Sequence, residues 1–151
     1  MADFKVLGTN HTSFTVSDLD RSLAFFRDIL GFTVTSKAPR DPRVIEQITG
    51  VDGAEVIIAY VQAPGHRIEL IQYLGPVDRG SVRPRPCDVG FVHVAFDVDD
   101  VGAAIAAAEA HEVRPINPPF LTDAGPNAGR SVVYLRDPDG ITIELIQRPQ
   151  S

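Results

Sequence analysis

The sequence Ile-Glu-Leu-Ile-Gln occurs twice in this chain, at residues 68–72 and again at residues 143–147, about half the chain length apart. The segments that begin at His11 and His93 also align without a gap, with Phe and Val at the same offsets in both. Such self-similarity indicates a duplicated structural unit. In a chain of 151 residues, two units of this size can share one hydrophobic core.

Each half is predicted to begin with a strand and a helix. Large apolar residues alternate with small or polar ones around His11 and His93, with the period of two that is typical of a strand. Both histidines therefore lie on the face opposite the large apolar side chains. A helix should follow each strand, because apolar residues then recur at helical spacing. The expected helices are residues 19–30 after a cap at Ser17 or Asp18, and residues 101–110 after a cap at Asp99 or Asp100.

Each half is predicted to end in a β-hairpin. The turns are Ala-Pro-Gly-His at residues 63–66 and Asp-Pro-Asp-Gly at residues 137–140. In the strand that follows each turn, the alternation directs the first isoleucine and the leucine of the repeat toward the helices. Glu69 and Glu144 then point to the face that the helices leave free.

Two segments lie outside the repeat. Residues 39–53 should form a loop with a short helix near residues 44–48. Residues 114–131 are rich in proline and glycine and should form a long loop over one end of the fold, of the kind that often closes over a functional site.

The composition limits the classes of function. The net charge of −6 argues against a nucleic-acid binder, and no stretch is apolar enough to cross a bilayer. The only cysteine, Cys87, excludes an intrachain disulfide and a cysteine-rich metal site. The first residues lack the apolar run of a signal peptide, so we expect a cytoplasmic protein. Arg79, Arg83 and Arg85 are interpreted either as a solvated linker or as an anion-binding loop.

Four residues carry the functional prediction. His11, Glu69, His93 and Glu144 all fall on the free faces of the predicted sheets. A carboxylate on an apolar strand is costly to bury alone, but a metal ion offsets that cost. Any one of these residues taken alone could be an ordinary polar surface residue, but the same types recur at matching positions in both halves. Two histidines with two glutamates suit a divalent ion such as zinc, nickel, cobalt, manganese or iron. Whether the four come from one chain or from two depends on how the modules pair.

The sequence also resembles the vicinal oxygen chelate superfamily, which includes glyoxalase I, methylmalonyl-CoA epimerase, extradiol dioxygenases and the fosfomycin- and bleomycin-resistance proteins. The segments that carry the resemblance are NHTSFTVSDLDRSLAFFRDILGF, GFVHVAFDVDD and YLRDPDGITIELIQ. The resemblance implies an α+β fold of paired βαβββ modules, with mixed sheets that curve around a metal-binding cleft. The modules would be residues 5–75 and 88–149, joined by a linker at residues 76–87 and forming one domain.

The resemblance places His11, Glu69, His93 and Glu144 on the metal-ligand positions of glyoxalase I; epimerases usually carry glutamine where this chain has Glu69. It implies a lyase or isomerase that removes a proton alpha to a carbonyl of a small oxygenated substrate, with the metal stabilising the enolate. Glu144 or Glu69 would be the catalytic base. Glu46 is a further candidate base, although its position favours a short surface helix. A homodimer is also expected.

The superfamily also includes two alternative functions. An extradiol dioxygenase needs a further histidine upstream of Tyr134, near residues 125–127, and none is present. A non-catalytic protein that binds a ligand or confers antibiotic resistance is the main alternative, although such proteins usually lack the four ligands. The two remaining histidines, His66 in a turn and His111 at a helix end, are expected to be solvated.

Overall fold

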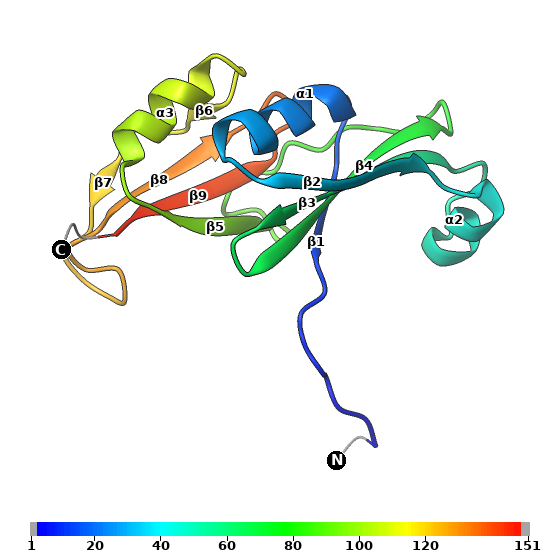
Figure 1. Ribbon diagram of the computed structural model, residues 1–151, viewed down its shortest axis with the longest axis horizontal. Coiled ribbons are helices and arrows are strands. Elements are labelled where there is room, and N and C mark those ends of the chain that lie inside the picture. Colours follow the sequence, from blue (N-terminus) through cyan, green and yellow to red (C-terminus); the bar gives the residue numbers. More distant parts are fainter. Residues whose placement is uncertain (1–2, 149–151) are drawn as a thin grey trace.

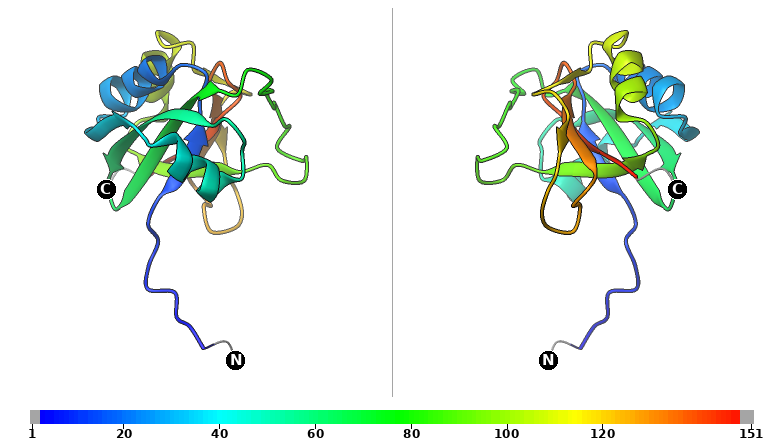
Figure 2. Two further views of the ribbon diagram at one scale, coloured as in Figure 1. Left: turned by 90° about the vertical axis from the view of Figure 1, so that its right-hand side faces the viewer. Right: turned by 90° about the vertical axis from the view of Figure 1, so that its left-hand side faces the viewer.

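The computed structural model describes residues 3–148, which form two mixed sheets with two helices on one side of them (Figure 1). The views in Figure 2 show α1 and α3 beside each other on that side, while the N-terminal arm leaves from the other. The predicted α+β architecture of paired modules is confirmed. In the first half, the elements are β1 (Thr12–Thr15), α1 (Leu19–Ala24), η1 (Phe25–Ile29), β2 (Thr33–Pro39), α2 (Pro42–Thr49), β3 (Glu55–Ala63) and β4 (His66–Gly75). In the second half, they are β5 (His93–Val98), α3 (Val101–Glu109), β6 (Arg114–Pro115), β7 (Phe120–Leu121), β8 (Ser131–Arg136) and β9 (Thr142–Gln147).

The two sheets repeat one topology. The first has the order β1-β4-β3-β2, and the second has the order β5-β9-β8-β6, with β7 also paired to β8. In each, the opening strand runs parallel to the strand that carries the repeated pentapeptide, and the hairpin strands run antiparallel. Both opening strands, β1 and β5, lie at the edge of their sheet.

One hydrophobic core extends through both halves. The first isoleucine and the leucine of each repeated pentapeptide are at most 1% exposed and face the helices, as the alternation predicts. Phe32 of the first half meets Phe96 of the second edge-to-face, with ring centroids 5.1 Å apart. Because α3 also contacts η1, the two halves share their helix-covered sides, and the opposite faces of the sheets remain open.

The final glutamine of each pentapeptide has a structural role. The Gln72 side chain accepts a hydrogen bond from the Leu19 backbone N–H at 2.9 Å, and the Gln147 side chain accepts one from the Val101 N–H at 3.0 Å. These N–H groups belong to the first turns of α1 and α3, where they have no partner within the helix. Asp18 and Asp100 cap the same helices, as predicted. The repeat therefore ties each helix to the strand that carries the glutamate.

A polar contact also joins the two halves. Asp139, in the turn between β8 and β9, accepts hydrogen bonds from the backbone N–H and the hydroxyl of Ser17, and its carboxylate lies 2.9 Å from the Arg21 guanidinium. Burial acts to raise the pKa of the Asp139 carboxyl, but the hydrogen bonds from Ser17 and Arg21 outweigh it, so the pKa is lowered. Ser17, one of the two expected caps, therefore serves this contact instead.

Two predicted elements differ in detail. The first helix does not run regularly to residue 30, because its last turn is the π-helical segment η1, in which the neighbours Phe25 and Phe26 are both buried. The long loop at residues 114–131 contains the short strands β6 and β7, which add to the edge of β8. The expected short helix at residues 44–48 is confirmed as α2.

Within residues 3–148, no helix has both the length and the apolar character required to cross a membrane.

Candidate active site

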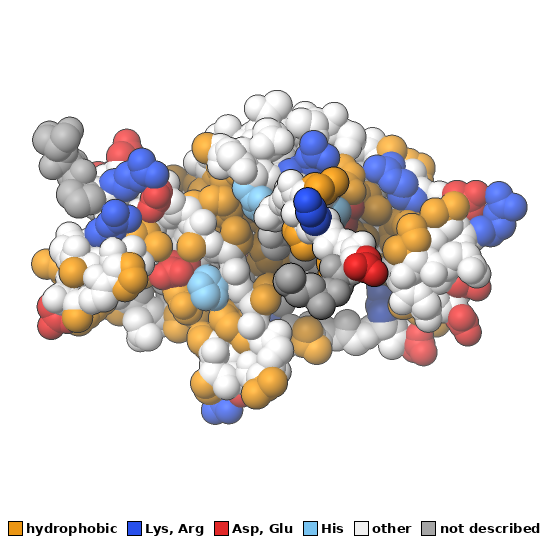
Figure 3. Space-filling model, turned by 90° about the horizontal axis from the view of Figure 1, so that it is seen from below, with side chains coloured by type: hydrophobic (Ala, Val, Ile, Leu, Met, Phe, Trp, Pro, Cys, Tyr) orange, Lys and Arg blue, Asp and Glu red, His pale blue; other side chains and the backbone are white. Residues whose placement is uncertain are grey.

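The strand register places each glutamate directly beside the opening strand of its half. Ser13 on β1 is opposite Glu69 on β4, and Ala95 on β5 is opposite Glu144 on β9. His11 and His93 lie two residues earlier in each half and therefore share the same open face. Figure 3 views this face and shows histidine side chains set among hydrophobic ones.

In the first half, the Glu69 carboxylate is held by hydroxyl groups from two neighbouring strands. The Ser13 hydroxyl donates to Oε1 at 2.9 Å, and the Tyr60 hydroxyl donates to Oε2. The His11 Nε2 lies 3.5 Å from Oε1. Glu69 is only 8% exposed, so these donors satisfy a carboxylate that water scarcely reaches.

In the second half, the corresponding carboxylate is less constrained. The Glu144 Oε2 lies 3.0 Å from the His93 Nε2, and Glu144 is half-buried. Ala95 stands where the first half has Ser13 and supplies no hydroxyl. Among the described residues, His93 is the one side chain in hydrogen-bond contact with Glu144.

A tyrosine lies opposite the glutamate in each half. Tyr60 on β3 pairs with Glu69, and Tyr134 on β8 pairs with Glu144. The Tyr60 ring meets the His11 ring edge-on with centroids 5.7 Å apart, and the Tyr134 ring lies 4.9 Å from that of His93. Burial raises the pKa of both phenols, and the neighbouring glutamate adds to the effect in each case, so both remain protonated at neutral pH.

The sequence prediction did not include Tyr60, Tyr134 or Ser13. Both tyrosines could have been found by counting back from the hairpin turns. The turn at residues 63–66 fixes the register of β3 and β4, and this register sets Tyr60 opposite Glu69. The same count across the second turn gives Tyr134 opposite Glu144.

The structure brings the four predicted ligands together as two pairs. His11 lies with Glu69 and His93 lies with Glu144, but within residues 3–148 of one chain no three His, Cys, Asp or Glu side chains are placed to hold one metal ion. Two ligands about 2.1 Å from a metal, at right angles to each other, are about 3 Å apart. The nitrogen-to-oxygen distances of 3.5 and 3.0 Å are therefore close to those of neighbouring ligands, and each pair fits half of a four-ligand set.

The other candidate residues lie elsewhere. Glu46 is on α2, and its carboxylate accepts a hydrogen bond from the Gly53 N–H, which agrees with the surface-helix interpretation. His66 is not simply solvated, because its Nε2 lies 2.8 Å from the Thr12 hydroxyl. His111 is half-buried at the end of α3.

The linker arginines make contacts within the chain. Arg79 donates to the Pro76 carbonyl at 2.7 Å, Arg83 donates to the Pro138 carbonyl, and Arg85 pairs with Asp88 at 2.8 Å. The contact of Arg83 joins the linker to the turn between β8 and β9, which favours a structural role for this arginine. The contacts of Arg79 and Arg85 are local.

A hollow of about 330 Å³ lies beside Tyr134, the strand partner of Glu144. Tyr134 contributes to its wall, and the rest is largely apolar and comes from the linker, the loop after β6, β7 and β8. Its apolar walls include Pro86, Ile116, Pro118, Phe120 and Val132. Its link to the second pair is Tyr134, whose ring lies 4.9 Å from that of His93.

Comparisons with known proteins identify the family of the chain. The family model described as the Glyoxalase/Bleomycin resistance protein/Dioxygenase superfamily matches residues 8–145. A 2-epi-5-epi-valiolone epimerase from an Actinomyces species is 31% identical over 148 residues, which cover 95% of this chain and 80% of that protein. The lactoylglutathione lyase of Haemophilus influenzae is 32% identical over 141 residues, which cover 91% of this chain and 90% of that protein. The crystal structure of a glyoxalase family protein from Bacillus cereus superposes with a TM-score of 0.82 at 26% identity and covers 97% of both chains.

Proposed function

Because the chain belongs to the Glyoxalase/Bleomycin resistance protein/Dioxygenase superfamily, we propose that it is a metal-dependent lyase or isomerase acting on a small oxygenated substrate. The observation that carries the proposal is the pair of a histidine nitrogen and a glutamate oxygen that each half holds within 3.5 Å on its open face. Relatives that are an epimerase and a lyase support a reaction of this kind.

The four ligands would be His11, Glu69, His93 and Glu144, with the two pairs supplied by different copies of the chain. Within one chain the pairs remain separate, because the halves meet through their helices rather than through their open faces. The edge strands β1 and β5 are free to approach the matching strands of a second copy. A homodimer would then contain two equivalent sites, each made of the first half of one chain and the second half of the other.

A divalent ion bound there would act as a Lewis acid toward the carbonyl oxygen of the substrate. This would make the proton on the carbon next to the carbonyl more acidic. The chain would supply the base. A glutamate takes the proton from the carbon next to the carbonyl and returns it to that carbon or to the adjacent one, so no other reactant is consumed.

Glu144 is the better base of the two glutamates. If the Glu144 side chain moves, it loses one hydrogen-bond contact, with His93. If the Glu69 side chain moves, it loses the hydrogen bonds from the hydroxyls of both Ser13 and Tyr60. The strand partner of Glu144, Tyr134, also lines the apolar hollow. Glu69 is therefore assigned the role of a fixed ligand.

Exchange of a substrate proton with solvent deuterium tests the proposal. Purified protein would be incubated in D₂O with hemithioacetals of 2-oxoaldehydes and with acyl-CoA thioesters, and the alpha position would be followed by NMR. We expect exchange that a chelator abolishes and that added zinc, nickel, cobalt or manganese restores. Binding without exchange across the panel, with strong thermal protection by an unreactive ligand, would instead indicate a ligand-binding or resistance protein.

A further inference from the structure

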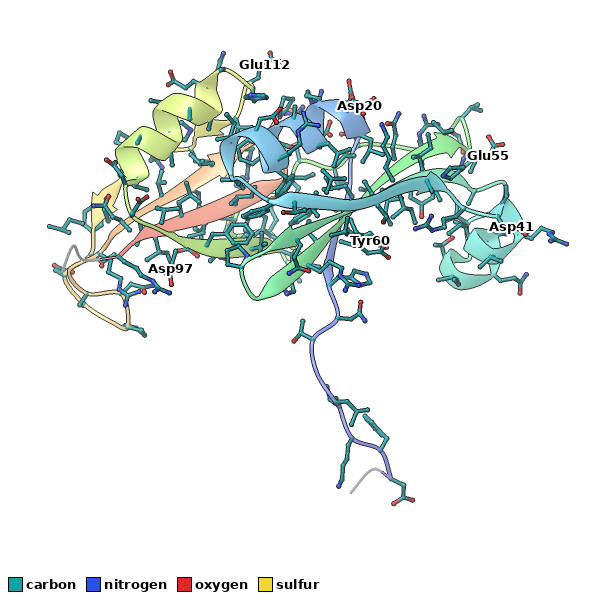
Figure 4. All side chains as sticks on the ribbon, in the orientation of Figure 1. Asp20, Asp41, Glu55, Tyr60, Asp97 and Glu112 are labelled. Carbon is teal, nitrogen blue, oxygen red and sulfur yellow. The ribbon has the colours of Figure 1, made fainter. Side chains whose placement is uncertain are left out.

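Tyr60 contacts both proposed ligands of the first half. Its hydroxyl donates to Glu69, and its ring meets the ring of His11 edge-on with centroids 5.7 Å apart. Figure 4 shows Tyr60 on the side of the sheet away from α1, which is the open face. An interaction with one ligand would be ordinary, but a side chain that touches both controls their relative placement.

The Tyr60 side chain is itself restrained by a neighbouring arginine and by partial burial. The guanidinium carbon of Arg67 lies 5.8 Å from the centre of its ring, within the range of a cation–π contact, and the ring is half-buried on a central strand of the sheet. A side chain restrained in this way loses little further freedom when it hydrogen-bonds to a ligand.

The second half provides an internal comparison. Tyr134 occupies the same strand position and also contacts its histidine, with centroids 4.9 Å apart. Its hydroxyl makes no hydrogen bond to Glu144 within the described chain, which leaves that glutamate with His93 alone. The duplication has thus kept the tyrosine in both halves but the hydroxyl-to-carboxylate bond in only one.

We propose that Tyr60 is a positioning residue that orients His11 and Glu69 for a divalent cation before the cation binds. The inference rests on the proposed metal site and extends it to a residue outside the four ligands. Hydrogen bonds from surrounding groups typically change metal affinity by about 10- to 100-fold, because they fix the ligands in the orientation that the ion requires.

Three variants separate the contributions of Tyr60. Tyr60→Phe removes the hydroxyl but keeps the ring against His11, and Tyr60→Gln keeps a hydrogen-bond donor at this position but removes the ring. Tyr134→Phe is the matched control, because it removes a hydroxyl from the equivalent position without breaking a bond to Glu144. Far-UV circular dichroism and the thermal midpoint of the metal-free proteins establish that each variant is folded. If Tyr60→Phe does not fold, Tyr60→Gln is used in its place.

Cobalt(II) is a suitable probe, because its visible absorption spectrum reports the ligand geometry. Titration of the metal-free proteins should show a dissociation constant raised about 10- to 100-fold in Tyr60→Phe, with an altered spectrum, and changed less than about threefold in Tyr134→Phe. Tyr60→Gln should also bind more weakly than the wild type.

Each other outcome has a distinct meaning. A wild type that binds neither cobalt nor another divalent ion would overturn the metal site together with this inference. A wild type that binds cobalt, with Tyr60→Phe unchanged in affinity and spectrum, would overturn the role of Tyr60 alone. Equal losses in Tyr60→Phe and Tyr134→Phe would also contradict it, since they would show a general effect of the phenols.

Discussion

The two halves of this molecule carry the same histidine, tyrosine and glutamate at matching strand positions, but they hold the glutamate differently. In the first half, the hydroxyls of Ser13 and Tyr60 fix the Glu69 carboxylate. In the second half, alanine replaces the serine, and Glu144 contacts His93 alone. Two copies of one unit thus differ in how many groups hold the glutamate, which suits the proposed site, in which Glu69 is a fixed ligand and Glu144 is the base.

The largest expected difference between the halves is in the rate of the chemical step. Glu144→Gln should lower kcat for alpha-proton exchange about 1000-fold with little change in KM, because a general base acts in the transition state. Glu69→Gln should act mainly by weakening metal binding, so that excess metal restores part of its activity. Steady-state kinetics at several metal concentrations distinguish the two, and the same behaviour in both variants would remove the assigned division of roles.

A smaller effect is expected from making the second half resemble the first. Ala95→Ser places a hydroxyl opposite Glu144, where Ser13 is opposite Glu69. If the new hydroxyl restrains Glu144, kcat should fall about tenfold, equivalent to about 1.4 kcal/mol, while metal affinity is maintained. The control is Ala95→Thr compared with Ala95→Val, which differ chiefly in the hydroxyl. A drop in the valine variant that equals the drop in the threonine variant would point to steric crowding instead.

Asp139 helps to hold the two halves in a fixed relative position. Its pKa is lowered in the folded state, so its contribution to stability is present above its unfolded pKa, about 3.9, and is lost as the pH falls through its folded value. Asp139→Asn should lower the free energy of unfolding by about 1 kcal/mol at pH 7, which is the usual net contribution of a hydrogen bond. In acid, the difference in unfolding free energy between the variant and the wild type should become smaller. Urea unfolding between pH 2.5 and pH 7 measures this, and a gap that is constant with pH would contradict it.

The smallest effects should be equal in the two halves. Gln72→Ala and Gln147→Ala each remove the side chain that accepts from the first turn of a helix, and each should cost about 0.5–1 kcal/mol. Gln47→Ala, at an exposed position on α2 where the described structure shows no side-chain hydrogen bond, is the control. Thermal unfolding of the three variants gives the values. A large loss in one half only would show that the duplicated scaffold is no longer symmetric.

The sequence predicted the duplicated scaffold well, because the period of its apolar residues and its turn residues reports local geometry directly. Asp18, Asp100 and the two hairpin turns all have their predicted places. The π-helical turn at Phe25 and the strands within residues 114–131 were not predicted, since both depend on tertiary contacts rather than on local pattern.

The candidate site was only partly accessible from the sequence. The alternation placed Glu69 and Glu144 on the open face, and the repeat linked them to the histidines. The hydroxyl donors to Glu69 come from two neighbouring strands, and whether they reach it is decided by side-chain conformations that no spacing encodes. The relation between the pairs was likewise open, because it depends on which faces of the two halves meet.

Subunit complementation tests the central claim, that one site is built from the first half of one chain and the second half of another. One variant, His11→Ala with Glu69→Gln, has a defective first half in every chain, and the other, His93→Ala with Glu144→Gln, has a defective second half. Neither should bind metal or exchange substrate protons alone. A refolded mixture should recover about one metal ion per heterodimer, with activity in proportion, because one site then receives an intact half from each chain. If the mixture stays without metal while the wild type, refolded in the same way, binds it, the four ligands act within one chain and the account is wrong.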